Sequence, residues 1–231
     1  SPAGPLYVFK HALTQHVAYG RLAPAERQRL HAAAGAALET LHGEHLDGVL
    51  EQLAHHWSQT DDHMKAIEYL TRVGDRATGA YALGEALTAL EQAEQHARLL
   101  AAGVSRDRAV IDLLVRQGLP LVQTGRLTDV RDRFLAEGAT VDRLGTDPVI
   151  AGYHLLLGLA FDHLGDQASA SSSARRAVEE SNRWGDGVTH GKACWVLSLG
   201  AFWSGAFDEG IRHAQRGAEL LGETRETWWL G

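Results

Sequence analysis

The side chains best suited to covalent chemistry in this sequence are those of His190 and Cys194. They lie four positions apart, so on a helix they would share one face, which is the minimum arrangement for a thiolate–imidazole pair. A nucleophile also needs a shaped pocket and a donor for the oxyanion, and the sequence around this pair indicates neither. We therefore interpret Cys194 as a packing residue and expect a segment that is not an enzyme.

A second candidate is the stretch 186–193, which reads DGVTHGKA and comes close to the phosphate-binding form Gly-x-x-x-x-Gly-Lys-Ser/Thr. It departs from that form at both ends. Asp186 replaces the first glycine and would repel phosphate, and Ala193 lacks the hydroxyl that holds magnesium. We interpret the stretch as a loop that opens a helix, and we expect no bound cofactor.

The chain has 13 histidines, which raises the question of a metal site. His42 and His45 lie three positions apart, His55 and His56 are adjacent, and His63 follows a turn. Zinc needs three or four convergent ligands. Adjacent helical residues point about 100° apart, so we expect that His55 and His56 do not share one ion. The sequence therefore predicts no metal site.

The elements that position these residues are predicted from a repeat. Gly125, Gly165 and Gly205 recur at a constant spacing, and each stands between two helix-like stretches. A helix–turn–helix unit cannot bury its apolar face alone, so neighbouring units must stack. The spacing of large and small residues resembles the tetratricopeptide pattern, with Ala170 or Gly210 at the small position 20 of a unit. We predict an all-α fold, a tetratricopeptide-like α-solenoid of stacked antiparallel helix pairs, without a β-sheet.

Apolar periodicity and the positions of glycine and proline set the helix boundaries. The predicted helices span residues 10–21, 24–42, 46–59, 63–81, 84–101, 105–124, 127–144, 149–164, 167–184, 188–204 and 207–222.

A binding groove is predicted along the first helices of the last two units. In such solenoids the inner surface is lined by positions 2, 5, 9 and 12 of each first helix, and here those positions are partly apolar with a few charges, which suits a peptide or a helix. Two interpretations stay open for the terminal aromatic residues: they line this groove, or they pack against a following repeat, to which Trp228 and Trp229 would belong. The candidate groove residues are Leu155, Leu159, Asp162, Lys192, Trp195, Leu199 and Phe202.

Composition limits the classes of partner. The 22 Lys and Arg residues are scattered among 29 Asp and Glu without a basic stripe, so we expect no nucleic-acid binding. No apolar run approaches the roughly 20 residues that cross a bilayer. A single cysteine fits a reducing cytoplasm. The first residue is not Met, so we expect a piece of a longer polypeptide.

The amino-terminal third of the chain has the most specific sequence pattern. The run YVFKHALTQHVAYGRLAPAERQRLHAAAGAALETL, followed by LEQLAHHW and KAIEYLTRVGDRA, resembles the junction in STAND-type ATPase regulators where a winged-helix remnant passes into a tetratricopeptide array. These segments are most similar to those of large bacterial proteins that carry a nucleotide cyclase domain. They are also similar to those of large ATP-binding LuxR-type regulators. His16 stands where the family has an acidic residue. The resemblance implies a junction in residues 1–42 and a repeat array in residues 43–231.

The resemblance further implies that the chain is a sensor arm, which couples a protein, a peptide or a small-molecule effector to ATPase or cyclase domains upstream in the same polypeptide. The repeat pattern alone implies less, namely a stand-alone scaffold or adaptor that binds proteins. The two hypotheses differ in what precedes Ser1.

Overall fold

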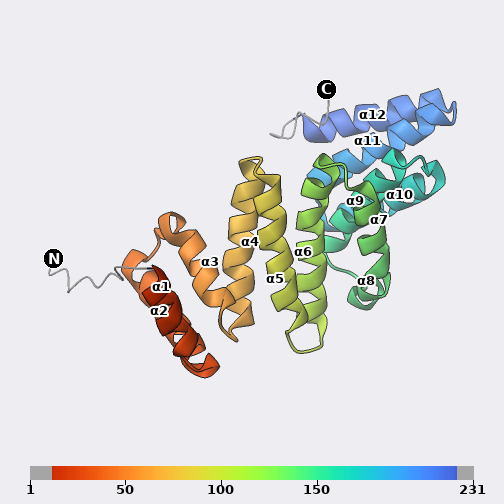
Figure 1. The fold of residues 1–231 in the computed structure, drawn as a ribbon. Coiled ribbons are helices and arrows are strands. Elements are labelled where there is room, and N and C mark those ends of the chain that lie inside the picture. The colour runs from red at the N-terminus through yellow and green to blue at the C-terminus, as the bar shows by residue number, and fades with distance from the viewer. Residues whose placement is uncertain (1–11, 223–231) are drawn as a thin grey trace. The chain divides into compact units, whose positions relative to one another are not determined.

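The computed structural model describes residues 12–222, and within this range the chain forms α-helices and one short 3-10 helix, with no strand (Figure 1). The helices follow the predicted boundaries closely. None of the described helices is both long and apolar enough to cross a membrane. The elements are α1 (Ala12–Arg21), α2 (Pro24–His42), η1 (Leu46–Val49), α3 (Leu50–Ser58), α4 (His63–Gly79), α5 (Leu83–Arg98), α6 (Val104–Gln123), α7 (Leu127–Ala136), α8 (Gly138–Leu144), α9 (Val149–His163), α10 (Gln167–Trp184), α11 (Gly187–Trp203) and α12 (Phe207–Leu221).

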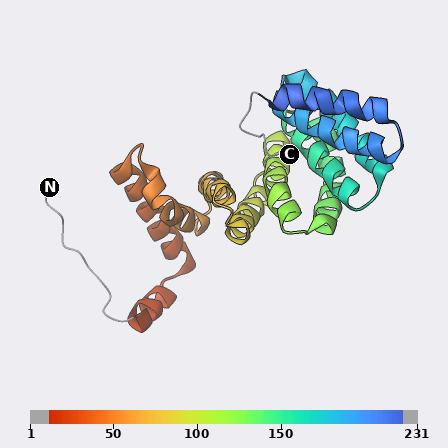
Figure 2. The same cartoon turned by 90° about the horizontal axis from the view of Figure 1, so that it is seen from above.

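The chain divides into two compact units, residues 1–70 and residues 71–231. In the first unit, α2 packs against α3. In the second unit, α9, α10, α11 and α12 pack as successive neighbours, and both views show α11 and α12 as an antiparallel pair (Figures 1 and 2). The predicted boundary between a junction and the repeats at residue 42 stays a prediction.

The turns at the three regularly spaced glycines share one geometry. Gly125, Gly165 and Gly205 have φ values of 74°, 83° and 78°, a left-handed conformation that a residue without a Cβ adopts at low cost. In each turn the next residue donates its backbone N–H to a carbonyl five positions earlier, as in a Schellman motif. These bonds are Arg126 N to Leu121 O at 2.9 Å, Asp166 N to Phe161 O at 3.0 Å, and Ala206 N to Ala201 O at 2.9 Å. The predicted periodicity is therefore the recurrence of one turn.

Small residues stand where paired helices cross closely. A Cβ added to Gly158 would lie 3.2 Å from the carbonyl oxygen of Ala170, and one added to Gly210 would lie 3.3 Å from that of Ser198. Both contacts are to the backbone of the partner helix, which cannot turn aside as a side chain does. Each contact involves Ala170 or Gly210, the residues predicted at the small position 20 of a unit.

Gln117 of α6 is a polar residue in the core of the second unit. Its side chain is fully buried. Its amide donates to the Glu94 carboxylate at 2.9 Å and accepts from the Arg133 guanidinium at 2.6 Å. Arg133 also donates to Glu94 at 2.7 Å. A satisfied polar network therefore replaces apolar packing at this position.

The predicted helix 127–144 is interrupted between Ala136 and Gly138, where α7 ends and α8 begins. In a continuous helix the Phe134 carbonyl would accept from the residue four positions later. Here it accepts from the Glu137 N–H at 3.0 Å and from the Tyr153 hydroxyl at 2.6 Å. The tertiary hydrogen bond from Tyr153 on α9 thus occupies the carbonyl at which the helix is broken.

Candidate functional site

The structure places the two predicted α9 groove residues in the core. Leu155 and Leu159 are 6% and 3% exposed and belong to one apolar cluster with residues of α10, α11 and α12. The reason is that α11 packs against α9 as well as against α10. Asp162, at the end of α9, accepts a hydrogen bond from the Gln167 amide at 3.1 Å. Apart from Asp162, which is partly exposed, the part of the predicted groove that a partner can reach lies on α11.

Four of the predicted groove residues form a stripe along α11, which we call the α11 stripe: Lys192, Trp195, Leu199 and Phe202. Their spacing of three, four and three positions places them on one face of the helix. The first three are partly buried, and Trp195 packs against the core of the last two pairs. Phe202, at the end of the helix, is 56% exposed. Accessibility thus increases toward the turn that joins α11 to α12.

Three aromatic side chains gather at this turn, and we call them the terminal aromatic cluster: Phe202, Trp203 and Phe207. The ring centroid of Phe202 lies 5.4 Å from that of Trp203 and 5.9 Å from that of Phe207, with edge-on geometry in both pairs. All three are more than half exposed. Exposed aromatic groups of this kind mark interaction sites more often than isolated apolar residues do.

Sequence reasoning noted the terminal aromatic residues but not their grouping, and it missed Ile211, which is 55% exposed on α12. The signal was available, because Phe207 and Ile211 lie four positions apart and share a face of that helix. Trp228 and Trp229, which the sequence analysis assigned to a following repeat as one alternative, lie outside the described residues.

A cleft of about 380 Å³ between α8, α9 and α10 was also missed. Its polar groups include Asp142 of α8, His154 of α9 and Arg176 of α10, and its apolar groups include Leu157 and Phe161. The signal for it was the pair Tyr153–His154 within the otherwise apolar run of α9.

His154 is 5% exposed, and its Nδ1 atom has no hydrogen-bond partner among the described residues. Burial, reinforced by the charge of Arg176, lowers the pKa of His154 to about 4, although Asp142 acts in the opposite direction. Burial also raises the pKa of Tyr153 to about 12. His154 and Tyr153 therefore keep their neutral forms near neutral pH.

The two catalytic candidates have structural roles. Asp186 caps α11, since its carboxylate accepts the Thr189 backbone N–H at 3.0 Å, which matches the interpretation of 186–193 as a loop that opens a helix. Cys194 is 2% exposed, and burial raises the pKa of its thiol. A thiol with a raised pKa is a poor nucleophile at neutral pH. His190 is also buried.

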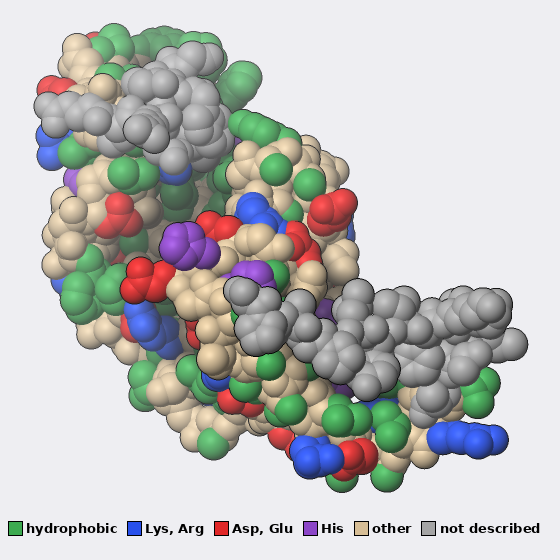
Figure 3. All heavy atoms as spheres, turned by 90° about the vertical axis from the view of Figure 1, so that its left-hand side faces the viewer, with side chains coloured by type: hydrophobic (Ala, Val, Ile, Leu, Met, Phe, Trp, Pro, Cys, Tyr) green, Lys and Arg blue, Asp and Glu red, His purple; other side chains and the backbone are tan. Residues whose placement is uncertain are grey.

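The arginines of the second unit are largely paired with carboxylates. Arg98 bonds Glu94 and Glu137, and Arg143 bonds Asp107, each at 2.6–2.7 Å. On the face drawn in Figure 3, Lys and Arg side chains are interspersed with Asp and Glu rather than gathered in one patch.

Comparison with known proteins gives a fold likeness. No protein-family model matches the sequence, and no curated protein matches it. The structure is similar to the apo form of RapI, with a TM-score of 0.62 and 12% identity over 94% of this chain and 60% of RapI. It is similar to BtubC from P. vanneervenii, with a TM-score of 0.58 and 12% identity over 89% of this chain and 76% of BtubC. It is also similar to MamA, with a TM-score of 0.53 and 14% identity over 87% of this chain and 96% of MamA.

All three are tetratricopeptide-like helical solenoids. This chain spans about 60% of the length of RapI. At these identities the likeness concerns the fold alone, and it agrees with the predicted class: an all-α, tetratricopeptide-like solenoid of stacked antiparallel helix pairs.

Proposed function

We propose that this chain is a non-catalytic protein-interaction segment, which binds an amphipathic helix of a protein partner along the α11 stripe and the terminal aromatic cluster. The observation that carries the proposal is the exposure of Phe202, Trp203 and Phe207 at the open end of a partly buried apolar stripe. The tetratricopeptide-like fold supports it, because stacked helix pairs present extended binding surfaces.

The chemistry of the surface defines the partner. Trp195 and Leu199 offer apolar area beside the aromatic rings. An amphipathic helix with apolar residues at positions i, i+3, i+4 and i+7 would complement this arrangement. Aromatic anchors of this kind commonly contribute most of the binding energy of an interface.

The test begins with peptides selected from a random library displayed on phage and presented to the immobilised chain. An enriched peptide, labelled with a fluorophore, is then titrated with the chain, and its polarisation gives the affinity. We expect Phe202→Ala and Trp203→Ala each to weaken binding by about 10-fold or more, because each removes an exposed aromatic anchor.

Val104→Ala is the matched control, since Val104 is a 67% exposed apolar side chain on α6. It should change the affinity less than about 2-fold. Enriched peptides that bind all three variants equally would show that the partner site lies elsewhere. If no peptide is enriched, while a longer chain that includes the following residues shields Phe207 and Ile211 from solvent, the aromatic residues pack against a further repeat instead.

We further propose the role implied by the resemblance of the amino-terminal third: a cytoplasmic sensor arm, with a junction in residues 1–42, that couples a partner or a small effector to ATPase or cyclase domains earlier in the same polypeptide. A ligand that prefers one curvature of a solenoid shifts the whole stack, by no more than its differential affinity for the two shapes. The encoding gene tests this role. A nucleotide-binding domain directly before residue 1 supports it, whereas a reading frame that begins near Ser1 leaves the stand-alone adaptor.

A further inference from the structure

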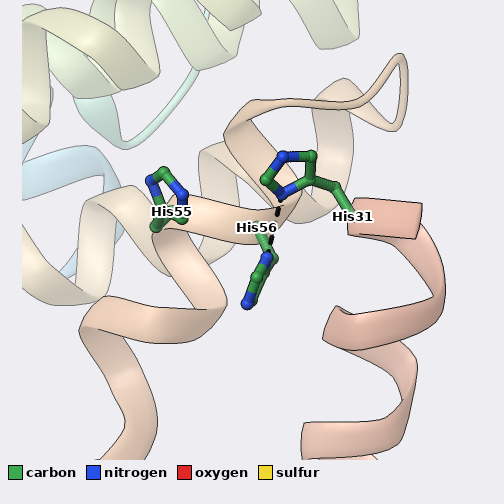
Figure 4. Close-up of side chains that lie close together, drawn as sticks. All are labelled: His31, His55 and His56. Atoms are coloured by element: carbon green, nitrogen blue, oxygen red, sulfur yellow. Dashed lines mark hydrogen bonds between the residues drawn. The ribbon is translucent and has the colours of Figure 1, made fainter. Parts of the chain in front are cut away.

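Three histidines from two helices converge in the first unit. His31 comes from α2, and His55 and His56 come from α3 (Figure 4). One ring nitrogen of each lies within 4.8 Å of the corresponding atoms of the other two. The sequence argument that His55 and His56 diverge by about 100° was therefore incomplete, because it considered a single helix. The residue that it lacked, His31, lies on the preceding helix α2.

The packing of α2 on α3 holds His31 in this position. Gly35, one turn after His31, lies against the Trp57 ring, and a Cβ there would come within 2.7 Å of it. One further turn along α2, Glu39 accepts hydrogen bonds from Lys65 at 2.7 Å and from Tyr69 at 2.8 Å. The face of α2 that carries His31 is thus fixed by a close helix contact and by an ion pair.

Both ring nitrogens of His31 have a hydrogen-bond partner. Nδ1 of His31 lies 2.9 Å from Nδ1 of His56, so one proton joins the two rings. Nε2 of His31 lies 2.9 Å from the Tyr19 hydroxyl. In the tautomer that carries its proton on Nε2, His31 donates to Tyr19 and directs the Nδ1 lone pair toward His56. Histidines that ligate metals typically have such an outer hydrogen bond, which fixes the tautomer.

The distances suit a first-row transition metal. With metal–nitrogen bonds of about 2.0–2.1 Å, tetrahedral ligand nitrogens lie about 3.3–3.4 Å apart. The three candidate donor atoms lie within 4.8 Å of one another, so the rings would have to turn to reach this spacing, and His55 is exposed. Burial, followed by the neighbouring histidines, lowers the pKa values of His31 and His56, which favours the neutral imidazole that binds metals.

We propose that His31, His55 and His56 bind one divalent transition-metal ion of the class that prefers imidazole, Zn²⁺ first, with water completing the coordination. A hydrogen-bonded pair of imidazoles accounts for His31 and His56 alone. The third ring, placed beside them on the solvent side, completes a ligand set. The bound ion would join α2 to α3 and stabilise the first unit.

The probe is Zn²⁺ alone, titrated into the full chain after chelator treatment and followed by calorimetry. Co²⁺ serves as a second probe, because its visible spectrum reports the coordination geometry. We expect one equivalent of tight binding to the unaltered chain. The double variant His55→Gln/His56→Gln, which leaves buried His31 in place, should weaken that site by at least about 100-fold, since it removes two of three ligands.

The control is His42→Gln/His45→Gln, which removes the same number of histidines from the same unit and should change the affinity less than about 2-fold. Circular dichroism verifies that each variant is folded. The affinity for Zn²⁺ is also measured for the single variant His55→Gln, which changes an exposed residue and leaves the His31–His56 pair intact. Equal weak binding by all variants would mean that scattered surface histidines take up the metal, and it would overturn the proposal.

Discussion

Phe134→Ala is expected to lower the free energy of unfolding of the second unit by about 3–5 kcal/mol, the usual cost of removing a buried phenylalanine. Phe134 is fully buried in the cluster formed by α5 to α9, and its ring stacks on that of Tyr153 at a centroid distance of 5.2 Å. The hydrogen bond from the Tyr153 hydroxyl reaches the backbone carbonyl of Phe134 and does not involve the Phe134 side chain. The variant therefore tests the packing of that side chain alone. Urea denaturation followed by tryptophan fluorescence measures the change.

Leu135→Ala is the control, because it truncates the next residue of the same helix, which is 52% exposed. It should cost less than about 1 kcal/mol. If the two substitutions cost the same, α7 does not pack against the core of the second unit as described.

Lowering the pH from 7.5 to 5 is expected to destabilise the second unit, because His154 becomes protonated in the unfolded chain but stays neutral in the folded one. The folded-state pKa of His154 is about 4, against an ordinary value of 6.5. Between these values the unfolded chain binds more protons than the folded chain, so stability is complete above pH 6.5 and falls as the pH decreases toward 4. By linkage, these two pKa values correspond to a loss of about 2 kcal/mol at pH 5 from His154 alone.

His154→Phe should remove this pH dependence, because it replaces a buried titratable ring by an apolar ring of similar shape. Asp142 and Arg176, which face His154 from α8 and α10, are unchanged in the variant. Burial also lowers the pKa of His190, so the quantity to compare is the difference between wild type and variant at each pH. His213→Gln on α12 serves as the control. An equal loss of stability in wild type and His154→Phe would show that the folded-state pKa of His154 is not lowered.

Features encoded locally were predictable from the sequence. The turns at Gly125, Gly165 and Gly205 follow from one residue type at a fixed spacing, because a left-handed turn residue favours glycine. The corresponding turn between α4 and α5 shows the limit of this signal. There Tyr81 has the positive φ, at 58°, and no glycine marks the position.

Features that depend on which helices meet were not predictable in the same way. Leu155 and Leu159 stand at groove positions of the repeat, yet α11 covers them. His31 joins His55 and His56 only because α2 lies against α3 at Gly35, and a single helical wheel cannot show a ligand from another helix. The cleft beside His154 likewise requires three helices to be placed before it exists.

The most direct test of the central claim is hydrogen–deuterium exchange of the chain, alone and saturated with a selected peptide. Binding along the α11 stripe and the terminal aromatic cluster predicts slower exchange in residues 192–207, with little change in α6 and α7. Protection confined to other helices, or no protection in 192–207, would contradict the proposal that this face receives the partner.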